Sequence, residues 1–193
     1  NVFIGDGAGH GSDGDQNVAI GVSALQTSET GNNVAIGAWA LAVNTTGGEN
    51  TAVGYSALMD NTTGTSNTAV GYKSLNENET GSANAAFGHY ALQSNTTGTA
   101  NTAFGQAALD SNTIGAGNVG VGKYALYSNV GGDYNVAMGM ESMRLNASGE
   151  RNVALGAYTL YTNTAGDKNV AIGNAAGFNN QTGSKNVFIG TEA

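Results

Sequence analysis

The sequence contains no cysteine, so it has no disulfide, no thiol nucleophile and no cysteine ligand for zinc. It also contains no proline, and only 10% of its residues are charged. Disordered chains are rich in proline and charge and poor in aliphatic residues, whereas 40% of this chain is hydrophobic. These absences argue against disorder and favour a folded chain with a hydrophobic core.

Positive charge is scarce as well. Six Lys and Arg residues stand singly among fourteen acidic residues, and the net charge is −8. Such a chain repels phosphate backbones, so we expect no nucleic-acid partner. No apolar run approaches the roughly 18 residues that a membrane span needs, so we expect no membrane insertion of this segment.

What the sequence has in abundance is repetition. The stretch "NTAVGYSALMDNTTGTS" at 50–66 is followed by "NTAVGYKSLNENETGSA" at 67–83, and related stretches cover the whole chain at intervals of 16 and then 17 residues. We number the positions of each repeat from its first Asn. The repeats begin at Asn1, Asn17, Asn33, Asn50, Asn67, Asn84, Asn101, Asn118, Asn135, Asn152, Asn169 and Asn186. Residues 1–193 are therefore interpreted as a single repeat domain.

Each repeat carries the pattern of a short strand between two corners. Val or Thr at position 2 and an aliphatic residue at position 4 alternate with a small residue, which is a strand pattern. Leu recurs at position 9, and Gly at positions 5 and 15 marks the corners because glycine adopts positive φ at little cost. Seventeen residues leave no room for a helix and its return connections.

Identical residues at fixed intervals favour a coil that winds once per repeat, because each position then stacks on its own copy about 4.8 Å away. The sequence thus predicts an all-β fold, a parallel β-roll (solenoid) of about eleven turns of 16–17 residues, roughly 50 Å long. We expect the Asn residues at positions 1 and 12 to form two hydrogen-bonded columns that also satisfy the backbone at the corners.

The small residue at position 3 predicts how chains associate. We expect the side chains at positions 2, 4 and 9 to fill the interior and the residue at position 3 to point outward. A uniformly small outward strip suits close packing between chains, so we predict a parallel homotrimer with this strip at its axis. The alternative is that a small residue is kept because the roll itself is crowded. The predicted trimer-interface residues are Ala19, Ala35, Ala52, Ala69, Ala86, Ala103, Ala137, Ala154 and Ala171.

Aromatic side chains gather at the variable positions 6, 7 and 10. Aromatic rings beside polar residues stack well against sugar rings or protein receptors, because they offer a large contact area at low entropy cost. The alternative is that they pack over the corner or against a neighbouring chain. The candidate receptor-contact residues, for a cell-surface glycan or protein, are Trp39, Tyr55, Tyr72, Tyr90, Tyr124, Tyr127, Tyr158 and Tyr161.

We expect no catalytic, cofactor-binding or metal-binding residues, and no cofactor. The acidic residues do not recur at one position, so they do not form the paired carboxylates that hydrolysis needs. The opening stretch "GDGAGHGSDGDQ" brings Asp6, Asp13 and Asp15 near His10, which makes a calcium site conceivable. Its spacing fits neither an EF-hand nor the nine-residue calcium-roll pattern, and we interpret it as a solvated turn. The end repeats replace the usual Ala by Phe3 and Phe188, which predicts tapering or joining turns.

Two motifs resemble known families. "NVAIG" at 17–21, 33–37 and 169–173 resembles the head repeats of trimeric autotransporter adhesins, and "NTAVGYSAL" at 50–58, followed by "NTTG", is similar to repeats of phage tail fibres and related bacterial surface fibres. The resemblance covers the whole chain. It implies a left-handed, homotrimeric β-roll outside the cell, on a cell surface or virion, that contacts a target cell. The 17-residue period is longer than that of the usual adhesin head.

The predicted function is accordingly structural and adhesive, not enzymatic: a segment of a longer trimeric fibre, from a phage tail or a bacterial adhesin, that takes part in host or target-cell attachment. One alternative is an ice-binding β-solenoid, because Thr51, Thr68 and Thr102 share position 2. Another is a carbohydrate-active β-helix enzyme, although such enzymes use longer coils and a groove lined by carboxylates.

Overall fold

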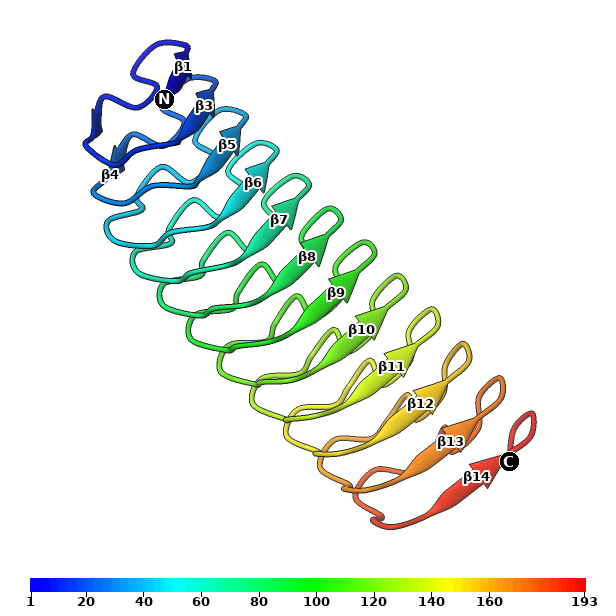
Figure 1. Ribbon diagram of the computed structural model, residues 1–193. Coiled ribbons are helices and arrows are strands. Elements are labelled where there is room, and N and C mark those ends of the chain that lie inside the picture. Colours follow the sequence, from blue (N-terminus) through cyan, green and yellow to red (C-terminus); the bar gives the residue numbers. More distant parts are fainter.

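The computed structural model describes residues 1–193 and is a parallel β-solenoid with no helix (Figure 1). Twelve three-residue strands, one per coil, form a single parallel sheet along one side, and the two ends of the chain lie at opposite ends of the rod (Figure 1). The prediction of an all-β solenoid of about eleven turns is confirmed. The structure contains no helix of the length and apolarity that crossing a membrane requires.

The strands of the large sheet follow one another in the order of the sequence, and two short strands form a separate pair in the first coils. Their bounds are β1 Val2–Ile4, β2 Gly11–Ser12, β3 Val18–Ile20, β4 Thr27–Ser28, β5 Val34–Ile36, β6 Thr51–Val53, β7 Thr68–Val70, β8 Ala85–Phe87, β9 Thr102–Phe104, β10 Val119–Val121, β11 Val136–Met138, β12 Val153–Leu155, β13 Val170–Ile172 and β14 Val187–Ile189.

Register is the same at every step of the large sheet. Thr51 pairs with Thr68 and Ala52 with Ala69, so each repeat position lies directly over its copy in the next coil. The predicted stacking of like residues is therefore confirmed, including across the 16-residue repeats, where Ala19 pairs with Ala35. Eleven steps of about 4.8 Å give a rod about 50 Å long.

The two asparagine columns form as predicted. At position 12, the Asn95 side-chain amide donates to Asn78 Oδ1 at 2.8 Å and to the Gly98 carbonyl at 3.0 Å. At position 1, the backbone N–H of Asn101 donates to Asn84 Oδ1 at 3.0 Å. From the third coil to the tenth these asparagines are fully buried, and each satisfies corner groups that would otherwise lack a partner.

The interior differs from the prediction in one respect: the alanine strip faces inward. All nine strand alanines are fully buried in a single cluster with the Leu column, whereas the residues at positions 2 and 4 lie on the outer face. The expected outward direction is wrong, and these alanines are not available to a partner chain. They are Ala19, Ala35, Ala52, Ala69, Ala86, Ala103, Ala137, Ala154 and Ala171.

The physical reason is the thinness of the coil. At Gly120, which occupies the alanine position of its coil, an added Cβ would lie 3.3 Å from the Ala125 carbonyl oxygen and 3.3 Å from Leu109 Cγ. A methyl group thus already fills the space between the strand and the opposite wall. Crowding within the roll, the alternative explanation for the small residue, accounts for the alanines.

The two glycine positions serve different purposes. Gly71, at position 5, has φ +139°, a conformation that side-chain-bearing residues rarely adopt, so the predicted corner is confirmed there. Gly64, at position 15, is not among the residues with positive φ. A Cβ at Gly64 would instead collide with the Gly81 carbonyl oxygen and with the Asn61 side chain. Position 15 therefore needs glycine because the asparagine column and the next coil approach its backbone closely.

Non-glycine residues adopt positive φ at positions 7 and 9 and at the last position of each repeat. Leu58 has φ 52°, Trp39 57° and Ser66 57°, and the same values recur in almost every coil. This conformation costs an L-residue roughly 1 kcal/mol or more. Hydrogen bonds between coils hold it, as when the Leu58 N–H donates to the Ser74 carbonyl at 3.0 Å.

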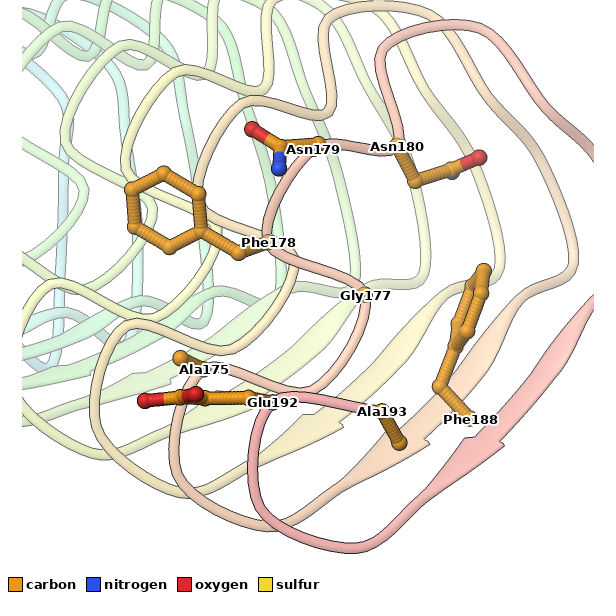
Figure 2. Close-up of a pocket in the computed structure, with 8 residues that line it drawn as sticks. All are labelled: Ala175, Gly177, Phe178, Asn179, Asn180, Phe188, Glu192 and Ala193. Atoms are coloured by element: carbon orange, nitrogen blue, oxygen red, sulfur yellow. The ribbon is translucent and has the colours of Figure 1, made fainter.

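The end coils fill the same interior in a different way. Phe188 in β14 stands at the alanine position, and Gly177 in the wall it faces stands at the leucine position (Figure 2). A Cβ at Gly177 would lie 2.8 Å from the Phe188 ring, and one at Gly9 would lie 2.6 Å from Phe3 Cε2. At both ends, a large residue on the strand and a glycine opposite replace the usual alanine and leucine.

Candidate functional site

Two surfaces of the rod stand out as candidate sites. The first, called the strand face, consists of the outward side chains at positions 2 and 4 of the twelve-stranded sheet. The second, called the aromatic strip, lies at the neighbouring corner, where positions 6, 7 and 10 of successive coils stack. The strip contains the eight predicted receptor-contact residues.

The strand face carries no charged residue on any of its twelve strands. Its most exposed members away from the ends include Phe104, of which 58% is accessible, and Met138, of which 45% is accessible. With a length of about 50 Å and side chains about 7 Å apart along each strand, the face covers roughly 350 Å², within the range of about 300–600 Å² for the largest apolar patch of a monomeric protein. A patch of this size is often functional.

The aromatic strip begins as a continuous stack over four coils. The rings of Tyr55 and Tyr72 are stacked with centroids 5.3 Å apart, and Tyr72 stacks on His89 at 5.2 Å. Trp39 meets Tyr55 edge-on at 5.2 Å, and Tyr90 closes the row against His89 at 4.0 Å. Trp39, Tyr55 and Tyr72 are exposed, whereas Tyr90 is half-buried.

A second aromatic group follows along the same corner. Tyr124 meets Tyr127 edge-on at 5.4 Å, and Tyr161 stacks on Phe178 at 5.0 Å with the two rings nearly parallel. Arg144 lies among them: its guanidinium carbon is 5.4 Å from the Tyr124 ring centroid, and its Nη1 donates to the Tyr161 hydroxyl at 3.0 Å. That hydrogen bond raises the pKa of Arg144, so the guanidinium remains charged.

The two groups are separated by a hollow of about 320 Å³. The coil between them carries Gln106, Ala107 and Asp110 at positions 6, 7 and 10, whereas position 7 carries Tyr90 and Tyr124 in the coils on either side. Ala107 is buried and forms the floor. The walls include Tyr90, Gln93, Gln106, Asp110, Tyr124 and Tyr127.

Two half-buried carboxyl groups lie along the same side of the rod. Burial, and secondly the charge of Glu77, raise the pKa of Asp110 to about 6. Burial also raises the pKa of Asp60, with smaller contributions from Glu77 and Glu79. Each of these carboxyl groups belongs to a different coil, and Asp110 is the carboxyl group that lines the hollow.

A larger hollow of about 620 Å³ lies at the carboxyl-terminal end (Figure 2). It is bounded by Phe188, by the segment around Gly177 and by Ala193, so it is the open end of the coil interior. Every solenoid viewed along its axis presents such a space, and it gives no argument for a ligand. At the opposite end, Asp6, Asp13, Asp15 and His10 do not form a group that could hold a metal ion.

Comparison of the chain with models of protein families, with curated proteins and with solved structures finds no match.

The structure places all eight predicted aromatic residues along one corner and adds three that the sequence analysis did not single out. His89 fills the gap between Tyr72 and Tyr90, Phe178 extends the second group, and Arg144 lies over its rings. Their repeat positions could have predicted this, because these residues occupy positions 6 and 10, which stack at this corner.

Proposed function

We propose that the chain is a rigid segment of a homotrimeric, left-handed β-solenoid fibre outside the cell, on a virion tail or a bacterial surface. In this proposal its role is structural and adhesive, not catalytic. The strand face joins three chains, and the aromatic strip contacts a glycan or protein of the target cell. The segment requires no cofactor, binds no nucleic acid and does not insert into a membrane.

The observation that carries the trimer is the strand face. Its side chains are apolar or Thr on all twelve strands, and the face runs the full length of the rod. A partner that matches it over this length and at this spacing is another copy of the same rod in parallel orientation, since every rung then meets an identical rung. Burying the face removes apolar surface from water at about 25 cal/mol per Å².

The sequence resemblance supports the same arrangement. "NVAIG" at 17–21 and 33–37 forms β3 and β5 and the glycine that ends each strand. Its Val and Ile belong to the strand face and its Ala to the core. The motif that resembles the trimeric adhesin heads is thus the part of the repeat that builds the proposed interface, which favours both the trimer and the left-handed winding.

Light scattering coupled to size-exclusion chromatography tests the trimer. We expect the wild-type chain to show three times the mass of one 19.3 kDa chain. Phe104→Lys places a charge on the strand face and should lower the mass to that of a monomer. Ile114→Lys is the matched control, because Ile114 is equally exposed but lies outside the strand face. A monomeric wild-type chain, or equal masses for both variants, would contradict the proposal.

Ice binding remains a second candidate, because the structure turns the Thr column outward. Thr51 and Thr68 lie on the uncharged strand face, but Ala85 interrupts their column before Thr102. A face that binds ice must be free of partner chains, so the two functions exclude each other on this surface. Thermal hysteresis from a monomeric protein would support ice binding, and its absence from a trimer would support the fibre.

A further inference from the structure

The hollow in the aromatic strip arises from one coil with small side chains. Tyr90 and Tyr124 occupy position 7 in the coils on either side of Ala107. Their backbones are therefore about 9.6 Å apart along the rod, which is two coil steps of about 4.8 Å. One saturated ring placed between the two tyrosines would fill this gap, with apolar contacts of about 4 to 4.5 Å on each side. The volume of about 320 Å³ lies at the lower end of the usual range for small-ligand sites.

The polar groups of the hollow suit hydroxyl groups. Gln93 and Gln106 bring side-chain amides, each with a donor and an acceptor, and Asp110 brings a carboxyl group. Asp110 takes part in neither of the ion pairs of the chain, which join Arg144 to Glu141 and Arg151 to Glu150. Its oxygens are therefore free to accept hydrogen bonds from a ligand.

Charge narrows the class of ligand further. The chain has a net charge of −8, and Glu77 adds to the negative potential at Asp110. An acidic sugar or a phosphate group would be repelled where it approaches Asp110, while Lys123 and Arg144 lie over the Tyr124 ring on the opposite wall. A ring with one apolar C–H face and several hydroxyl groups, but no charge, fits both the tyrosines and the amides.

We propose that the hollow around Ala107 binds one neutral hexopyranose unit of a surface glycan, stacked against Tyr90 and Tyr124 and hydrogen-bonded by Gln93, Gln106 and Asp110. This inference rests on the proposed function, because it gives the adhesive strip a ligand. Hydrolysis is not part of it, since the cleavage of a glycosidic bond requires two carboxyl groups and Asp110 is the one that lines the hollow.

Saturation-transfer NMR on the full chain tests the inference with three probes: methyl α-D-glucopyranoside, methyl β-D-galactopyranoside and methyl α-D-mannopyranoside. We expect transfer to the ring protons of at least one of them. Ala107→Tyr fills the hollow with the residue that position 7 already carries in the adjacent coils, and it should weaken binding at least tenfold. Ser23→Tyr, at position 7 of a distant coil, is the matched control and should bind as the wild type does.

A second variant covers the case in which Ala107→Tyr disturbs the coil. Gln106→Ala removes one amide from an exposed position, and we expect binding at least threefold weaker with an unchanged circular dichroism spectrum. Absence of transfer to all three sugars would overturn the inference. Undiminished binding of a sugar by Ala107→Tyr would also overturn the inference.

The outcome separates this inference from the proposed function. If the chain is trimeric by light scattering but binds no pyranose, only the sugar-binding inference is contradicted. A monomeric chain that binds a pyranose in the hollow, with the loss expected for Ala107→Tyr, contradicts the fibre and leaves the binding site standing.

Discussion

At the scale of single residues, the alanine at position 3 determines how thin the solenoid is. Ala69 is fully buried between the strand and the Leu column, and its neighbour Val70, one residue later, lies on the outer face. The usual rule that larger apolar residues are buried is thus reversed within one strand. The reversal follows from geometry, because the two walls of the coil are close enough for a methyl group to bridge them.

Replacing Ala69 by Leu should therefore destabilise the chain. The added methylene and methyl groups have no space to enter, and overpacking of this kind costs about 1–3 kcal/mol. Thr63→Leu, a larger side chain at an exposed position outside the strand face, is the control and should change stability by less than about 0.5 kcal/mol. Urea unfolding followed by circular dichroism measures both, and equal midpoints would show that the core is not tightly packed at this position.

Asp110 gives a prediction about pH. Its pKa is raised to about 6 in the folded chain and is close to 4 in the unfolded chain. The folded state therefore binds the proton more tightly, so the stability that the protonated group supports is complete below about pH 4 and is lost as pH rises through about 6. Asp110→Asn should raise the unfolding midpoint at pH 7.5 and leave it unchanged at pH 3.5. An equal effect at both pH values would contradict the shift.

At the scale of elements, a strand of three residues is too short to be stable alone and depends on the strands beside it. Repeat length, the position of each strand and both asparagine columns follow from the sequence, since each requires only that like residues stack. Which face of the strand points inward was not predictable in this way, because the alternation of residues shows that the two faces differ but not which one is buried. The end coils indicate the answer, because they carry a large residue at position 3 together with a glycine at position 9: Phe3 with Gly9, and Phe188 with Gly177. The side chains at these two positions therefore share one space.

The aromatic strip shows a similar limit. Its residues were identified from their types and positions, but the hollow depends on side-chain volumes in three adjacent coils around Ala107. A pattern that describes one repeat at a time does not contain this information.

Because Phe188 and Gly177 replace the usual alanine and leucine together, substitutions at the two positions should have strongly non-additive effects on stability. Phe188→Ala should leave a void, and Gly177→Leu should clash with the Phe188 ring, so each single change destabilises the last coils. The double variant restores the pattern of the inner coils, where Leu adopts φ close to that of Gly177. Amide hydrogen exchange of the last two coils should therefore be faster in both single variants than in the double variant. Additive effects would show that the residues do not share the space.

At the scale of the whole molecule, each coil contacts only the coils before and after it, so stability is expected to be a sum over neighbouring coils. Deleting residues 67–83, one complete repeat, should preserve every column and shorten the rod by about 4.8 Å. Solution X-ray scattering should show the shorter rod with an unchanged circular dichroism spectrum. Deleting residues 67–74, half a repeat, brings Leu75 under the asparagine column and should lower the unfolding midpoint. Equal midpoints for both deletions would contradict stacking in register.

The asparagine ladders also make the rod polar along its axis. In both columns, the bonds between neighbouring asparagines all run the same way: Asn61 donates to Asn44, Asn78 to Asn61 and Asn95 to Asn78. One end of each ladder therefore ends in amide donors and the other in carbonyl acceptors. Two such rods can continue each other's ladders head to tail, but head to head they would bring donor against donor. Any longer filament built by end-on stacking of this module would inherit a single orientation from its first unit.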